Sequence, residues 1–235
     1  MSKKLITIIG DHYAHGPRDL CGFPSRLFTE LSSREPDTCW AIFGGGYNGG
    51  IRSVKDRLSK TIMETFSFEV DDYTAIIWVG IGETKSGGIP YDAWKSMLNQ
   101  MVCMCSAADL NVVLIKPVVP PSNFIDKHMR RWIRRTQSMC QEVASKNRIQ
   151  CIEVDLQDDD FVDLYSLSAR GYQRIAGQVA DSLLGIRDNE KEARIIYKHK
   201  KQLSGSIAKE KAKGDSDAVV ITQPDRVKGS GRGNG

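Results

Sequence analysis

The chain has 235 residues, of which 40% are hydrophobic and 26% charged, with a formal net charge of +4. This composition predicts one α/β domain with a sizeable core, and the apolar runs are too short to predict a membrane span. The six cysteines form no CxxC pair, which favours reduced thiols over a zinc centre. The first apolar stretch is too short for a signal peptide, so we expect a cytoplasmic or nuclear protein that is not secreted.

Charge is distributed unevenly along the chain. Residues 1–185 carry 21 Lys and Arg against 22 Asp and Glu, whereas residues 186–235 carry 12 against 7. The sequence therefore predicts a nearly neutral domain, 1–185, followed by a basic helix and flexible tail, 186–235. A basic tail of this kind favours an anionic partner.

Strand-like apolar runs alternate with segments of helical periodicity. The predicted strands are 4–10, 39–46, 73–82, 110–121 and 149–155. The predicted helices are 24–34, 51–66, 91–108, 126–147 and 168–185. Because strand and helix alternate, the fold class is α/β, with a three-layer, doubly wound, five-stranded parallel sheet.

Functional groups in such sheets gather at the carboxyl ends of the strands. Four segments at these ends, within residues 4–185, resemble the conserved blocks of the SGNH (GDSL-type) esterases and lipases. In chain order they are Gly10-Asp11-His12, the GGGYNGG segment with Gly49, Gly80-Ile81-Gly82-Glu83, and Asp163-Leu164-Tyr165-Ser166. The resemblance implies the fold described above and the location of a site.

The resemblance also implies a mechanism that this chain lacks the side chains to perform. In that family a serine of the first block attacks the ester, and a histidine of the fourth block, oriented by an aspartate, takes its proton. A glycine amide and an asparagine stabilise the oxyanion. Here His12 replaces the serine, Gly82 the asparagine and Ser166 the histidine, while Gly49 and Asp163 match. We therefore expect an inactive protein in which these five are relic positions and no cofactor is used.

A second interpretation follows from the exchange of serine and histidine. His12 and Ser166 could form a reversed pair in a rearranged esterase or acyl hydrolase, with Asp11 or Glu83 orienting the histidine. The simpler interpretations of His12 are a turn histidine bonded to a backbone carbonyl or a ligand contact in a binding cleft. No metal site is expected, because residues 158–160 (DDD) are predicted to form an exposed loop without partner carboxylates.

The helix predicted over 126–147 concentrates basic side chains on its outer face. Its core side is formed by Met129, Trp132, Ile133, Thr136 and Cys140. Its outer side carries the candidate nucleic-acid contacts Lys127, Arg130, Arg131, Arg134 and Arg135, to which the tail adds Lys198, Lys200 and Lys201. Guanidinium groups can bind phosphates in a forked geometry. The alternative is a solvated face whose charges pair with nearby Asp and Glu.

Two separate basic elements favour RNA or DNA as the partner. No signature of sequence-specific recognition is present, so we expect binding through charge. Members of the SGNH family that have lost the triad serve as binding modules, and related domains occur in proteins of mobile elements. The resemblance is therefore compatible with a nucleic-acid-binding module of mobile-element origin.

Overall fold

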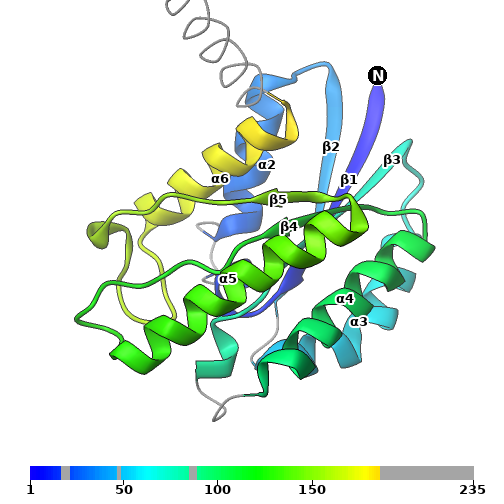
Figure 1. Ribbon diagram of the computed structural model, residues 1–235. Helices are drawn as coiled ribbons and strands as arrows, with labels where there is room; N and C mark the ends of the chain where they lie inside the picture. Colours follow the sequence, from blue (N-terminus) through cyan, green and yellow to red (C-terminus); the bar gives the residue numbers. More distant parts are fainter. Residues whose placement is uncertain (17–21, 47–48, 85–88, 186–235) are drawn as a thin grey trace, which may run out of the picture. The chain divides into compact units, whose positions relative to one another are not determined.

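A computed structural model describes residues 1–16, 22–46, 49–84 and 89–185 (Figure 1). The segment 186–235, for which we predict a basic helix and tail, lies outside the described residues, as do Lys198, Lys200 and Lys201. No helix among the described residues is long and apolar enough to cross a membrane.

Five parallel strands form a single sheet in the order β2-β1-β3-β4-β5. They are β1 (Ser2–Gly10), β2 (Thr38–Gly46), β3 (Asp72–Trp78), β4 (Asn111–Ile115) and β5 (Gln150–Ile152). The predicted doubly wound sheet is confirmed. The third and fourth strands end earlier than the sequence predicts, because the chain turns at Gly80, where φ is 137°, and meets Pro117 after β4.

Helices cover both faces of the sheet (Figure 1). They are α1 (His12–His15), α2 (Phe23–Arg34), α3 (Ile51–Thr65), α4 (Tyr91–Ala107), α5 (Lys127–Asn147) and α6 (Ala169–Leu183). Two 3-10 turns, η1 (Gly82–Thr84) and η2 (Asp158–Asp160), complete the elements. Helices α2 and α6 pack together on one face, and α3, α4 and α5 pack in a row on the other.

The core lies between these layers and fixes the strand ends. In β1, consecutive apolar residues are buried on both faces of the sheet, including Ile8 and Ile9, as expected for a central parallel strand. Helix α5 begins one residue later than predicted, because Asp126 is its N-cap and accepts the amide of Met129 at 2.7 Å. The single turn α1, which is not among the predicted helices, follows β1 directly.

Candidate functional site at the carboxyl edge

Asp11 joins the end of β1 to the chain that leaves β3. Its side chain is buried, and Oδ2 accepts the backbone amides of Gly80, Ile81 and Gly82 at 2.7, 2.9 and 3.0 Å. Its own amide donates to the carbonyl of Trp78 at 3.1 Å. Burial raises the pKa of Asp11 to about 7, and the charge of Glu83 adds to the rise, while the three amides oppose it. Asp11, in the first block, therefore fixes the backbone turn of the third block at residues 80–82.

Gly82, which stands where the family has an asparagine, is in direct contact with the second block. A Cβ atom added at Gly82 would lie 2.2 Å from the carbonyl oxygen of Gly49 and 2.9 Å from the Cα of Gly50. Gly49 has a φ of 142°, which favours glycine. The backbones of the two blocks therefore occupy the space that a side chain at position 82 would need.

Glu83 caps a helix from a different loop. Its buried Oε1 accepts the amide of Ile51, the first residue of α3, whose N-cap residue Gly50 has no side chain to do so. Burial raises the pKa of Glu83, whereas the amide of Ile51 and the indole of Trp94 lower it. Neither Oε2 nor Trp94 Nε1 has a hydrogen bond of good geometry among the described residues. In the sequence, only the glycine at the N-cap position indicates that a side chain from another segment must accept the first amides of α3.

His12 and Tyr13 connect α1 to the fourth block. The half-buried ring of His12 packs against Tyr165, with 5.3 Å between the ring centroids. Tyr13 is buried, and its hydroxyl donates to the carbonyl of Leu164. Burial also raises the pKa of Tyr13. The structure therefore brings the first and fourth blocks together at the carboxyl edge, and Tyr13 was not identified from the sequence.

Asp163 and Ser166, the positions of the family's acid and base, take part in a local turn. The exposed carboxylate of Asp163 accepts the amide of Tyr165 at 2.7 Å. The carbonyl of Ser166 accepts the amides of Val162 and Asp163 at 3.0 and 3.3 Å. Ser166 itself is half-buried, and Ser168 caps α6 by accepting the amide of Gly171 at 3.1 Å. The hydrogen bond from Tyr165 makes Asp163 a turn residue in this structure.

In the acidic run before the fourth block, Asp158 and Asp159 are exposed as predicted, but Asp160 is not. Asp160 is fully buried, and its Oδ2 accepts the amide of Gln157 at 2.8 Å and pairs with Arg174 at 3.0 Å. Asp159 pairs with Arg170 of the same helix at 2.6 Å. Asp160 can be buried because Arg170 and Arg174 of α6 lie against its carboxylate, and their charges offset the cost of removing it from water. Among the described residues, no group of three or more His, Cys, Asp and Glu is arranged to hold a metal ion.

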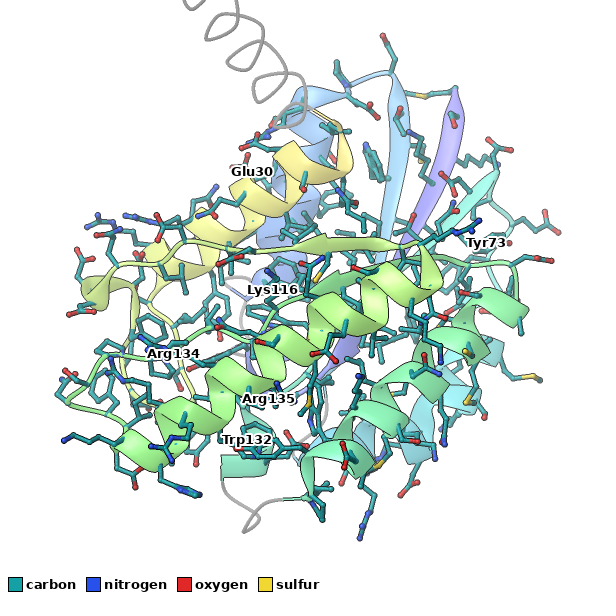
Figure 2. All side chains as sticks on the ribbon, viewed as in Figure 1. Glu30, Tyr73, Lys116, Trp132, Arg134 and Arg135 are labelled. Carbon is teal, nitrogen blue, oxygen red and sulfur yellow. The ribbon has the colours of Figure 1, made fainter. Side chains whose placement is uncertain are left out.

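The outer face of α5 carries the basic side chains that the sequence indicated (Figure 2). We call Lys127, Arg130, Arg131, Arg134 and Arg135 the arginine surface. Arg130 is half-buried and the other four are exposed. Within the described part of the chain none of the five forms an ion pair with a carboxylate, although the charge of Arg135 helps to lower the pKa of Glu142.

The opposite face of α5 anchors the helix to the domain. Trp132 is 9% exposed and packs at centroid distances of 6.2 Å from Trp94 and 6.5 Å from Tyr91. Of the core residues predicted for this helix, Ile133, Thr136 and Cys140 are also buried, whereas Met129 is only half-buried. The arginine surface is therefore displayed on a firmly packed element.

Solved structures of esterases share this fold. An acetyl xylan esterase, AlAXEase, aligns with a TM-score of 0.64 at 12% identity, covering 76% of this chain and 98% of the esterase. A lipase/acylhydrolase from Enterococcus faecalis aligns at 0.61 and 18% identity, over 79% and 96% of the two chains. A putative lipolytic protein of the G-D-S-L family from Desulfitobacterium hafniense DCB-2 aligns at 0.58 and 14%, over 75% and 97%. No protein-family model and no curated protein matches the sequence. The fold is thus SGNH-hydrolase-like.

Proposed function

We propose that this SGNH-hydrolase-like domain is a catalytically inactive binding module whose arginine surface binds the phosphates of nucleic acid. The observation that carries the proposal is that none of these side chains forms an ion pair with a carboxylate in the described residues. Three basic residues elsewhere do form such pairs: Lys95 pairs with Glu142, Lys116 with Glu153 and Arg34 with Asp181. Unpaired guanidinium groups on one helix face are available to an external polyanion.

The position of the cations along α5 supports the same proposal. The amino-terminal end of a helix carries a partial positive charge. Basic residues there therefore destabilise the helix, and acidic residues stabilise it. Helix α5 has no acidic residue in its first turn and instead has Lys127 and, just beyond, Arg130 and Arg131. The carboxylate of Asp126 already caps the end of the helix. Stability alone would not select the cations that follow this cap, whereas an external anion could bind their side chains.

Inactivity as an esterase is supported by the geometry at the carboxyl edge. The backbone of Gly49 fills the space that an asparagine side chain at position 82 would require. Position 12 offers an imidazole instead of a hydroxyl nucleophile, and position 166 offers a hydroxyl instead of a base. An oxyanion donor, the nucleophile and the base are therefore all different from those of the family mechanism.

Salt-dependent binding tests the proposal. Full-length protein is titrated into a fluorescein-labelled 20-nucleotide single strand between 50 and 300 mM NaCl, with fluorescence anisotropy as the readout. With about four to eight phosphate contacts, the logarithm of affinity should fall with the logarithm of salt at a slope of about 0.7 per contact. Alanine at Arg130, Arg131, Arg134 and Arg135 should weaken binding to all sequences alike and reduce the slope by about 3. Truncation after Gly185 should have a smaller effect of the same kind.

Helix α3 supplies a control with the same change in charge. It carries four basic residues, which are Arg52, Lys55, Arg57 and Lys60. Their replacement with alanine also lowers the net charge by four, so a general charge effect would reduce the slope as much as the α5 variant does. Equal slopes for the two variants, or an unchanged slope after the α5 and tail changes combined, would contradict binding through the arginine surface.

A second candidate function is a hydrolase that uses His12 and Ser166 in exchanged roles. The observation that favours it is the contact of His12 with Tyr165, the residue next to Ser166 in the chain. Turnover of p-nitrophenyl acetate and butyrate tests it. If this site is active, His12→Ala and Ser166→Ala each abolish turnover; we expect the wild-type rate to equal the buffer background.

A further inference from the structure

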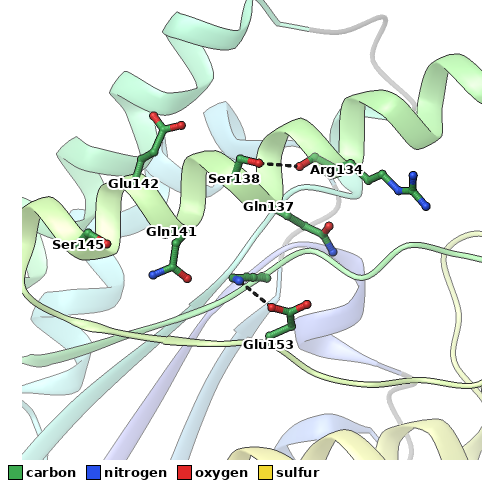
Figure 3. A pocket seen from close by; sticks show the side chains of 8 residues that line it. Arg134, Gln137, Ser138, Gln141, Glu142, Ser145 and Glu153 are labelled. Atoms are coloured by element: carbon green, nitrogen blue, oxygen red, sulfur yellow. Dashed lines mark hydrogen bonds and ion pairs between the residues drawn. The ribbon is translucent and has the colours of Figure 1, made fainter.

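A polar groove runs along α5 beside the chain that leaves β4 and β5 (Figure 3). Its volume of about 690 Å³ is within the range of ligand sites. Every residue lining this groove is polar or charged, and the carbon stems of these side chains form part of its surface. The groove therefore suits a ligand that carries hydroxyl and anionic groups.

The charges of the groove leave one cation without a partner. Lys116 pairs with Glu153 at 2.7 Å, and Glu142 pairs with Lys95 of α4. Arg134 is the remaining full charge, and it has no carboxylate partner among the described residues. Because Arg134 also belongs to the arginine surface, a polyanion bound there can continue directly into the groove.

The ion pair inside the groove is asymmetric. The side chain of Lys116 is 16% exposed, while that of Glu153 is 70% exposed. Lys116 is therefore held in place by its surroundings, whereas Glu153 can turn into solvent at little cost. A phosphate that enters the groove can replace the carboxylate as the partner of Lys116.

Two glutamines face the groove from successive turns of α5 (Figure 3). Gln137 donates to the carbonyl of Pro117 at 2.7 Å, which fixes its amide. Gln141 is exposed and has no hydrogen bond among the described residues, so both its donor and its acceptor are free. A ribose 2′-hydroxyl, which also donates and accepts, matches this pair of groups.

We propose that the groove binds the ribose–phosphate backbone of a single RNA strand that continues from the arginine surface. One phosphate lies between Arg134 and Lys116 and displaces Glu153, and Gln141 contacts a 2′-hydroxyl. The inference rests on the proposed function and deepens it by naming RNA as the ligand. None of the described residues that line the groove is aromatic, so the groove contacts the backbone and not the faces of the bases.

Three variants of the full-length chain test the groove against matched fluorescein-labelled oligonucleotides. The probes are 12-mers of uridine and of deoxyuridine, which differ only in the 2′-hydroxyl, measured by anisotropy at 100 mM NaCl. Glu153→Gln should tighten binding of both probes about two- to fivefold, because it removes the competing carboxylate. Glu64→Gln, which removes the same charge from the Lys60–Glu64 pair on α3, should change affinity less. Gln141→Ala should weaken binding of the uridine probe by about two- to tenfold and leave the deoxyuridine probe unchanged.

The outcomes separate the groove from the arginine surface. Equal effects of Glu153→Gln and Glu64→Gln, or an unchanged preference for RNA in Gln141→Ala, overturn the groove even if the arginine variant still loses affinity. Loss of both effects together with an unaffected arginine variant overturns the proposed function as well. Glu153, Glu64 and Gln141 are exposed, and thermal unfolding of each variant at the wild-type temperature confirms that the comparison is between folded proteins.

Discussion

The carboxyl edge of the sheet and the arginine surface of α5 use their polar groups in opposite ways. At the edge, Asp11 accepts three backbone amides, Glu83 caps α3, and Gly82 lies against Gly49. On α5, four of the five basic side chains are exposed, and none of the five forms an ion pair with a carboxylate in the described residues. The carboxyl edge is where functional groups usually gather in such sheets, but its carboxylates bond to backbone amides and connect segments of the fold. The basic side chains of α5, in contrast, are groups that a ligand can reach.

This difference predicts how each region tolerates substitution. Buried groups whose partners are fixed lose stability when changed, because the partner is left unsatisfied or the backbone must move. Exposed side chains away from caps and cores usually change stability by less than about 0.5 kcal/mol. Changes at the edge should therefore be detected in the free energy of unfolding, and changes on the arginine surface should be detected in binding alone.

The largest effect is expected beneath the arginine surface. Trp132→Ala should lower the free energy of unfolding by about 3–5 kcal/mol, because it removes the ring that packs against Trp94 and leaves a cavity. Urea denaturation followed by circular dichroism measures the change. Arg131→Ala, one residue away and exposed, is the control and should be within about 0.5 kcal/mol of wild type. Similar losses of unfolding free energy in the two variants would contradict the distinction between the buried face of α5 and its exposed arginine surface.

The next effect tests the contact between the second and third blocks. Gly82→Ala should destabilise the domain by about 3 kcal/mol, the upper end for overpacking, since its Cβ would meet the Gly49 carbonyl. The matched control is Gly177→Ala in α6, where a Cβ would lie 3.7 Å from its nearest neighbour. That variant should be neutral or up to about 1 kcal/mol more stable. A fully stable Gly82→Ala protein would show that the edge can open to admit a side chain.

The buried carboxyl group of Asp11 should produce a measurable pH dependence. Its pKa rises from 3.8 to about 7 on folding, so between these values the folded state holds a proton that the unfolded state has lost. Stability from this group is therefore present below about pH 4 and is lost as the pH rises to 7. Asp11→Asn has no such proton, so its stability relative to wild type should increase with pH by about 1 kcal/mol per unit. A constant or falling difference from pH 4 to 7 would show that the carboxyl group is not buried as described.

The smallest expected effect is on ester hydrolysis. The double variant His12→Ser, Ser166→His restores the residue types of the family, yet turnover of p-nitrophenyl butyrate should stay at background. The reasons are that Gly82 offers no side-chain amide and that Asp163 accepts the amide of Tyr165. Wild-type protein and buffer are the references. A clear rise in turnover would mean that the backbone of the carboxyl edge is arranged for catalysis, and that the wild-type protein lacks activity only because of the side chains at positions 12 and 166.

Local patterns were sufficient to predict the layers of the fold and the two faces of α5. A continuous apolar run such as that of β1 can be buried only at the centre of a sheet covered on both sides. The helical period likewise separated Trp132 from Arg131 and Arg134. Both patterns depend on residues close together in the sequence, so they could be read without knowledge of the fold.

Contacts between distant parts of the chain could not be predicted in this way. The sequence by itself determined the parallel sheet, the substitutions at positions 12, 82 and 166, and the charge of α5. Only the tertiary structure decided that Asp11 would hold residues 80–82, that Glu83 would cap α3, and that Asp160 would be buried under α6. The physical reason is that a carboxylate's partners are backbone amides and arginines supplied by other loops and helices, and no local period records which of them will meet it.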